Sequence, residues 1–268
     1  MPDEGYFGSG DNQLAYSCAI PAGEAKKVGI LFVHAAGGNR LGPHRMFVEL
    51  ARGFNLLGYP VLRFDLSGCG DSEGDISRGD IGEEISDVAE AVRFFAGRAK
   101  LESVILFGIS RGSRVCYGVM EQGGLPLAGM ILLSIPMSSR AAAIKSFKGY
   151  LKEYILKLRD RKRIWKLLSG KADWVQIRRT LAIALQLKDR YGRIEKKRLV
   201  SKCPILFVYG GGDPIAAEAS RYYSDKCREN ELSYECHVIP DANHSFFHYK
   251  WTEEIFGLSK KWLERISG

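Results

Sequence analysis

Short runs of apolar residues alternate with longer segments of mixed polarity along most of the 268-residue chain. The short runs are rich in β-branched and aromatic residues, which is typical of strands, and the segments between them are typical of helices. This alternation predicts an α/β fold with a mainly parallel central sheet flanked by helices on both faces. The predicted strands lie near residues 13–21, 28–34, 59–65, 103–109, 129–135, 203–209 and 234–239.

The clearest helix is expected to begin after Asp80. The Asp80 carboxylate can cap the first turn, and Glu83 three residues later completes a capping box. Apolar residues then recur at spacings of four and three, which places them in one buried stripe. They are Ile81, Ile85, Val88, Val92 and Phe95.

One predicted strand runs directly into a glycine-flanked serine. Ser103 to Phe107 is followed by Gly108-Ile109-Ser110-Arg111-Gly112, and a helix is expected next. A serine at such a junction can occupy a nucleophile elbow, a strained turn that exposes the hydroxyl and requires small residues two positions to either side. Ser110 is therefore the candidate nucleophile.

A carboxylate and a histidine follow two later strands, in the order that an elbow serine requires. Asp213 follows the run 204–209, and His244 follows 234–239. Both positions lie just past the carboxyl ends of strands, where ligands gather in open α/β sheets. Asp241 is a second carboxylate near His244, but strand-end position and glycine context favour Asp213.

These motifs resemble those of the α/β-hydrolase superfamily over nearly the whole chain. Val33-His34-Ala35-Ala36-Gly37-Gly38 is similar to its oxyanion-loop motif, with Ala35 in place of the usual glycine. Arg63-Phe64-Asp65-Leu66-Ser67-Gly68-Cys69-Gly70-Asp71-Ser72 is similar to its next loop, with Ser67 where arginine is common. The segments 42–48 and 71–74 more narrowly resemble hydrolases associated with bacterial exosortase and exopolysaccharide systems.

The resemblance implies roles for further residues. The backbone N–H groups of Ala36 and Arg111 are expected to form the oxyanion hole. Ala35, Arg45 and Arg111 are candidate substrate contacts, although the Arg111 side chain can equally turn away into a salt bridge.

Other polar residues of these motifs are expected to support the site without doing chemistry. His34 is expected to shape the oxyanion loop, and Asp65 and Ser72 are expected to hold the loop after the third strand. His44 can simply open a helix, and His237 is expected to be a packed or surface residue of its strand.

The alternation of strands and helices is interrupted between the fifth and sixth of these strands. The resemblance implies a core of residues 1–136 and 199–268, with 137–198 as a helical cap insertion. Residues 140–198 contain 19 Lys and Arg and 5 Asp and Glu, a net charge of +14 that leaves −6 for the rest of a chain of +8. The basic character therefore belongs to the insertion.

That charge indicates attraction to an anionic substrate, an anionic membrane or an acidic polysaccharide. The alternative is the solvated face of cap helices, since Trp174, Ile177, Leu181, Ala184 and Leu185 form an apolar stripe among the basic residues. Nucleic acid is not an expected partner, because no nucleic-acid-binding module accompanies the charge. Nothing in the sequence indicates an oligomeric state.

The remaining composition favours a cytoplasmic enzyme without a cofactor. The apolar fraction is 46%, no apolar run is long enough to span a bilayer, and residues 1–5 lack the features of a signal peptide. The six cysteines have no metal-ligand spacing, and several fall in predicted elements, which is typical of reduced core residues. Neither a metal nor an organic cofactor is expected.

Together these patterns predict a serine hydrolase that cleaves a carboxylic ester or thioester, possessing a Ser110–His244–Asp213 triad and an acyl-enzyme intermediate. An acyltransferase of the same fold is an alternative, because an alcohol or amine can capture the acyl group if water is excluded. The alternative from another class is a non-catalytic binding protein of this fold.

Overall fold

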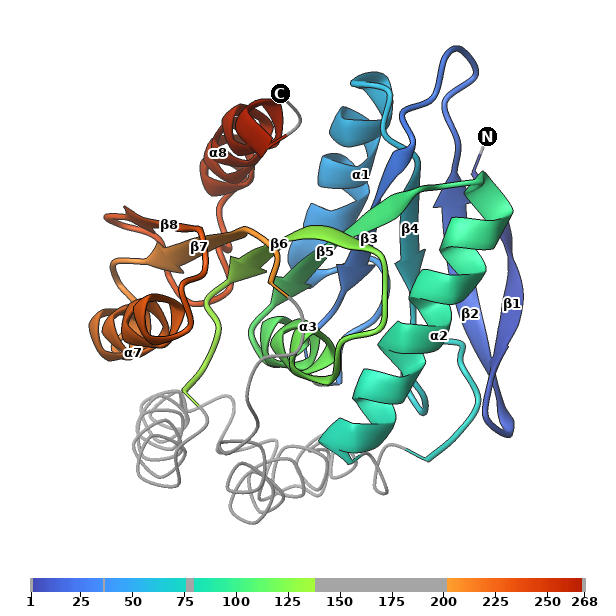
Figure 1. Ribbon diagram of the computed structural model, residues 1–268, viewed down its shortest axis with the longest axis horizontal. Coiled ribbons are helices and arrows are strands. Elements are labelled where there is room, and N and C mark those ends of the chain that lie inside the picture. Colours follow the sequence, from blue (N-terminus) through green and yellow to red (C-terminus); the bar gives the residue numbers. More distant parts are fainter. Residues whose placement is uncertain (1, 36, 76–79, 138–201, 267–268) are drawn as a thin grey trace, which may run out of the picture. The chain divides into compact units, whose positions relative to one another are not determined.

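The computed structural model of the chain describes residues 2–35, 37–75, 80–137 and 202–266. Its strands form one sheet in the order β1-β2-β4-β3-β5-β6-β7-β8 (Figure 1). β1 and β2 pair antiparallel, β2 pairs antiparallel with β4, and every other neighbouring pair is parallel. The bounds are β1 Asp3–Ser9, β2 Asn12–Ala19, β3 Val28–Val33, β4 Val61–Phe64, β5 Ser103–Ile109, β6 Leu127–Leu133, β7 Ile205–Gly210 and β8 Tyr234–Ile239.

All seven predicted strands are present, and the mainly parallel α/β sheet is confirmed. β1 is the strand that the sequence pattern missed. It is an edge strand that contains Gly5 and Gly8, and only Phe7 and Ser9 are buried in it. A glycine-containing strand with so few buried positions lacks the apolar run by which the other strands were recognised.

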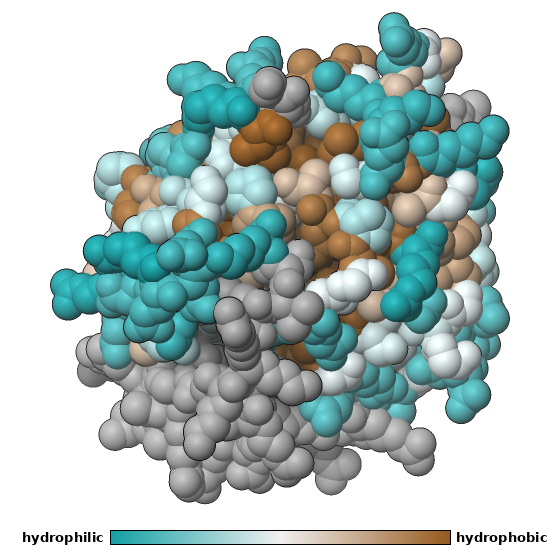
Figure 2. Space-filling view, in the orientation of Figure 1, coloured by the Kyte–Doolittle hydropathy of each residue, from teal (hydrophilic) through white to brown (hydrophobic). Residues whose placement is uncertain are grey.

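Helices cover both faces of the sheet (Figure 1). α1 (Met46–Leu56) and α8 (Tyr249–Ile266) lie on one face, and a short 3-10 helix, η1 (Pro43–Arg45), precedes α1. α2 (Ile81–Ala99), α3 (Arg111–Gln122) and α7 (Ala216–Glu229) lie on the other face. Hydrophilic residues gather over α7 in Figure 2, as expected for a helix with one buried face and one solvated face.

The predicted helix after Asp80 is α2. The Asp80 side chain accepts a hydrogen bond from the Gly82 N–H at 3.4 Å, so the predicted N-cap is confirmed. All five residues of the predicted stripe are at most 6% exposed. This burial fixes α2 on the sheet, where its first turn reaches the start of α3.

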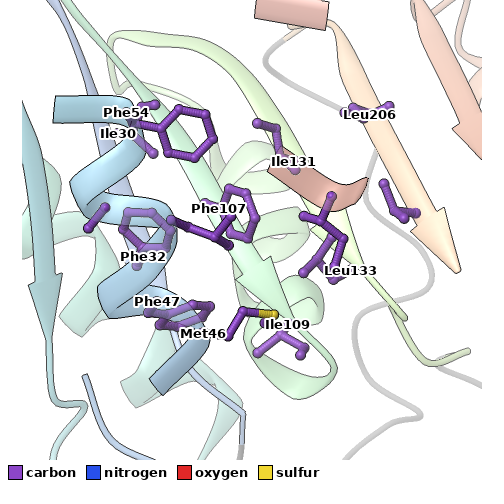
Figure 3. Close-up of a cluster of buried hydrophobic side chains, with 14 of the residues drawn as sticks. Ile30, Phe32, Met46, Phe47, Phe54, Phe107, Ile109, Ile131, Leu133 and Leu206 are labelled. Atoms are coloured by element: carbon purple, nitrogen blue, oxygen red, sulfur yellow. The ribbon is translucent and has the colours of Figure 1, made fainter. Parts of the chain in front are cut away.

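A cluster of aromatic and aliphatic side chains fills the space between the sheet, α1 and α8 (Figure 3). The Phe32 and Phe107 rings lie side by side on β3 and β5, with centroids 4.9 Å apart, and Phe47 of α1 packs 5.0 Å from Phe32. All three are fully buried. Full burial of one such side chain stabilises the fold by roughly 1.5–3 kcal/mol. This packing therefore holds β3 and β5 firmly in place, so the loops that follow them start from a well-packed part of the sheet.

The predicted cap insertion, 137–198, lies almost entirely outside the described residues and stays a prediction. Within the described residues, no helix combines the length and apolar character needed to cross a membrane.

Candidate functional site

Ser110 lies at a sharp turn between β5 and α3. Its backbone has φ 51° and ψ −120°, a conformation that L residues rarely adopt. A Cβ on Gly108 would lie 2.7 Å from the Ser113 Cα, and one on Gly112 would lie 2.3 Å from the Val33 carbonyl oxygen. Both glycines are therefore required by close backbone approach, and together they allow the strained turn that presents the Ser110 hydroxyl.

His244 connects Ser110 with Asp213. Its Nε2 lies 2.9 Å from the Ser110 Oγ, and its Nδ1 lies 2.6 Å from the Asp213 Oδ2. With the Nδ1–H donated to the carboxylate, Nε2 is left to accept the serine hydroxyl. The three side chains predicted from sequence are thus brought together from the ends of β5, β7 and β8, 134 residues apart at their widest.

The Asp213 carboxylate is nearly buried, with 3% of the side chain exposed, whereas 20% of His244 is exposed. The other Asp213 oxygen, Oδ1, accepts the Ile215 N–H at 3.2 Å. A Cβ on Gly210 would lie 2.3 Å from the Ala242 carbonyl oxygen, so the two loops that carry Asp213 and His244 pack directly against each other. Asp241 is exposed, and the histidine hydrogen-bonds Asp213, as the glycine context indicated.

Helix α3 begins at Arg111, immediately after the serine. The first N–H groups of a helix carry the positive end of the helix dipole, which favours negative charge there. The Arg111 N–H is therefore suited to an oxyanion beside Ser110. Ala36, the other predicted donor, lies outside the described residues.

The Arg111 side chain turns into an ion pair with Glu84 of α2. The Arg111 Nε lies 2.9 and 2.8 Å from the two Glu84 carboxylate oxygens, and the side chains are only 12% and 15% exposed. This is the salt-bridge alternative considered for Arg111. Of the other predicted substrate contacts, Ala35 is half-buried and Arg45 is exposed.

His34 is buried and lies in the loop after β3. Its Nδ1–H donates to the Ala35 carbonyl at 2.7 Å, and its Nε2 accepts the Leu66 N–H at 3.0 Å. Burial lowers the pKa of His34, and the contact with Ala35 and the nearby carboxylates only partly oppose this. A neutral ring bonded on both nitrogens shapes the loop, as expected.

Asp65 and Ser72 support the loop after β4. The Ser72 hydroxyl donates to the Asp65 carbonyl at 2.7 Å and accepts the Ala15 N–H at 2.8 Å. The fully buried Asp65 carboxylate accepts the Asp71 N–H at 3.0 Å and pairs with Arg40. Both contact sets fit the supporting role expected of these residues.

Two other histidines make contacts away from Ser110 and Asp213. The exposed His44 donates from Nε2 to the Ser245 carbonyl at 3.3 Å, and its ring meets Phe247 edge-on. The half-buried His237 lies 3.3 Å from Glu235.

Three further residues hold the loops and the helix start around Ser110, and the sequence pattern did not single them out. They are Arg40, Glu84 and Asp87. Asp87 of α2 accepts bonds from the hydroxyls of Ser9 and Ser67 and from the Ser67 N–H. Each of these contacts joins residues at least 20 positions apart, and no local pattern marks them. Among the described residues, no group of His, Cys, Asp or Glu has an arrangement suited to a metal ion.

Solved structures of low sequence identity share the fold. The esterase Pf2001 of Pyrococcus furiosus is 19% identical, with a TM-score of 0.72 over 100% of this chain and 92% of its own. Dienelactone hydrolase from Anabaena variabilis is 17% identical, with a TM-score of 0.63 and 98% of both chains covered. Est1E from Butyrivibrio proteoclasticus, solved with ferulic acid bound, is 17% identical, with a TM-score of 0.62 over 98% of this chain and 100% of its own.

No curated protein matches the sequence. The family model described as "Alpha/beta hydrolase family" matches residues 30–257, which include the elbow, the strand-end carboxylate and the histidine. This chain therefore belongs to the α/β-hydrolase family.

Proposed function

We propose that this protein is a serine hydrolase that cleaves a carboxylic ester or thioester through an acyl-enzyme. The observation that carries the proposal is the continuous hydrogen-bonded chain from Ser110 through His244 to Asp213, with heavy-atom distances of 2.9 and 2.6 Å. A neutral serine hydroxyl is a weak nucleophile, and a base within hydrogen-bond reach is what activates it.

Each group has a defined chemical role in the proposed reaction. As the Ser110 Oγ attacks the acyl carbon, the His244 Nε2 takes its proton, and the same nitrogen then gives that proton to the leaving alcohol or thiol. Asp213 maintains the imidazole tautomer and stabilises its positive charge. A water molecule, deprotonated by His244, then hydrolyses the acyl-enzyme and releases the acid.

The negative charge of the tetrahedral intermediate needs hydrogen-bond donors. The Arg111 N–H at the start of α3 is proposed as one, and the Ala36 N–H as the other. Loss of one such donor typically costs about 3–4 kcal/mol of transition-state stabilisation. Because the Arg111 side chain is paired with Glu84, only its main chain is assigned to this task.

The proposal is tested by intact-mass labelling with a fluorophosphonate and by turnover of a chromogenic ester series of increasing acyl length. We expect a single adduct on the wild type and none on Ser110→Ala. His244→Ala should lose nearly all turnover, and Asp213→Asn should lose roughly 10⁴-fold in kcat. Ser220→Ala, which removes a half-buried hydroxyl that bonds the Ala217 carbonyl of its own helix α7, is the matched control and should label like the wild type.

The alternatives give different results in the same assay. A folded wild type that forms no adduct would contradict the proposal and favour a binding protein. Labelling without hydrolysis, together with acyl transfer to an added alcohol or amine, would favour the acyltransferase.

A further inference from the structure

Two loops beside the proposed nucleophile are joined through a buried carboxylate. The loop after β3 starts against the elbow, because a Cβ on Gly112 would lie 2.3 Å from the Val33 carbonyl oxygen and 2.5 Å from that of His34. The loop after β4 starts with Asp65, whose side chain is fully buried. Burial of a carboxylate is costly unless it is paired and hydrogen-bonded.

Arg40 supplies the charge and two of the donors that Asp65 needs. Its backbone N–H donates to the Asp65 Oδ1, and its guanidinium donates to the Oδ2. The same guanidinium lies 2.8 Å from the Asp71 Oδ2, and Arg63 donates to the Arg40 carbonyl at 3.2 Å. Main chain and side chain of Arg40 are therefore both fixed to the loop after β4.

Further contacts at Asp65 hold the loop after β4. The Asp65 Oδ2 also accepts the Asp71 N–H at 3.0 Å. Gly70, with φ 53°, passes so close that a Cβ there would lie 2.1 Å from this oxygen. The loop after β3 is thus fixed at both ends, at His34 by the Leu66 N–H and at Arg40 by the Asp65 carboxylate.

We propose that Arg40 and Asp65 are positioning residues for the reaction, which fix the loop after β3 against the Ser110 elbow so that its backbone can serve the oxyanion. This inference rests on the proposed function. Neither side chain is assigned a contact with the substrate. A displacement of about 1 Å in the reacting geometry can lower the rate on the order of 100-fold. Arg40 can therefore affect the chemical step without touching the substrate, through the position of the loop after β3.

The test compares Arg40→Gln with the wild type and with Arg93→Gln, which removes an exposed ion pair on α2. We expect Arg40→Gln to lower kcat for an ester substrate by about 10- to 100-fold with KM nearly unchanged, because transition-state stabilisation is lost while substrate binding is kept. The second-order rate constant for fluorophosphonate labelling should fall in parallel. Arg40→Lys keeps a cation but loses the fork geometry of the guanidinium. Its kcat should lie between those of Arg40→Gln and the wild type.

The outcomes separate this inference from the proposed function. Equal kcat in folded Arg40→Gln and wild type would overturn the positioning role, and so would a rise in KM alone, which indicates direct substrate binding. If Arg40→Gln has no cooperative unfolding transition, Arg40→Lys replaces it, and a kcat within about twofold of the wild type then overturns the role. A wild type that neither labels at Ser110 nor hydrolyses esters overturns both proposals.

Discussion

At the scale of single residues, the candidate site combines a constrained backbone with buried polar groups. Ser110 keeps a rare conformation only because Gly108 and Gly112 let neighbouring backbone approach closely. His34 is fully surrounded yet has a partner for each ring nitrogen, which is the usual condition for a buried polar group.

The burial of His34 predicts a pH dependence of stability. The pKa of His34 in the folded protein is lowered, whereas the pKa of a histidine in the unfolded chain is about 6.5. The unfolded chain therefore binds more protons at this site below that pH. The stabilisation is complete above about pH 6.5 and is lost as the pH falls toward the folded pKa.

Urea unfolding of the wild type and His34→Gln at about pH 7.5 and about pH 5.5 measures this effect. The glutamine carbonyl can still accept the Leu66 N–H, so the variant should keep the fold. We expect a smaller loss of unfolding free energy on acidification for the variant than for the wild type. Equal losses in the two proteins would contradict the prediction.

At the scale of elements, α1 and α8 meet through aromatic rings on one face of the sheet. The Phe54 ring of α1 is fully buried and lies 5.1 Å from that of Phe256 on α8. Two residues later, 88% of Leu56 is exposed. One helix thus presents a buried and an exposed large apolar side chain within a single turn.

These two positions form a matched pair for a packing test. Phe54→Ala should lower the unfolding free energy by about 3–5 kcal/mol, because it removes buried surface and leaves a cavity. Leu56→Ala should change it by no more than about 0.5 kcal/mol. Chemical denaturation followed by circular dichroism measures both, and similar losses in the two variants would contradict the placement of α1.

Elements marked by a local sequence pattern could be predicted, whereas contacts between distant segments could not. The strand that precedes Ser110 and the stripe on α2 are local patterns, and Asp213 and His244 follow apolar runs that mark strand ends. β1 was missed because its glycines break the pattern. The Arg111–Glu84 and Arg40–Asp65 pairs depend on which loops meet in three dimensions, and residue spacing carries no such information. The narrower similarity to exosortase-associated hydrolases stays a prediction.

At the scale of the whole molecule, all six cysteines are free and five are buried. They fit the expectation of reduced core residues. Burial raises the pKa of Cys69 to about 12 and that of Cys18 to about 11, so little reactive thiolate forms at neutral pH. Cys69 is therefore an unreactive packing residue of its loop, and Cys236 is the exposed thiol.

Alkylation of the native protein tests this distribution. Brief treatment with iodoacetamide at about pH 8 should modify Cys236 first and leave the other five cysteines unmodified. Their burial restricts reagent access and disfavours the reactive thiolate. The same treatment in denaturant should modify all six. Peptide mass mapping locates the adducts, and native modification of Cys69 as fast as Cys236 would contradict the structure.

Ser110, Asp213 and His244 come from three strand ends that are far apart in the sequence. Bringing such distant residues together has a loop-closure entropy cost that the packing of the whole sheet must outweigh. In an incompletely assembled sheet Ser110 is an ordinary alcohol without its base. The proposed reactivity is thus a property of the finished fold, and the unfolded chain, in which Ser110 has no base beside it, is expected to be inert toward esters.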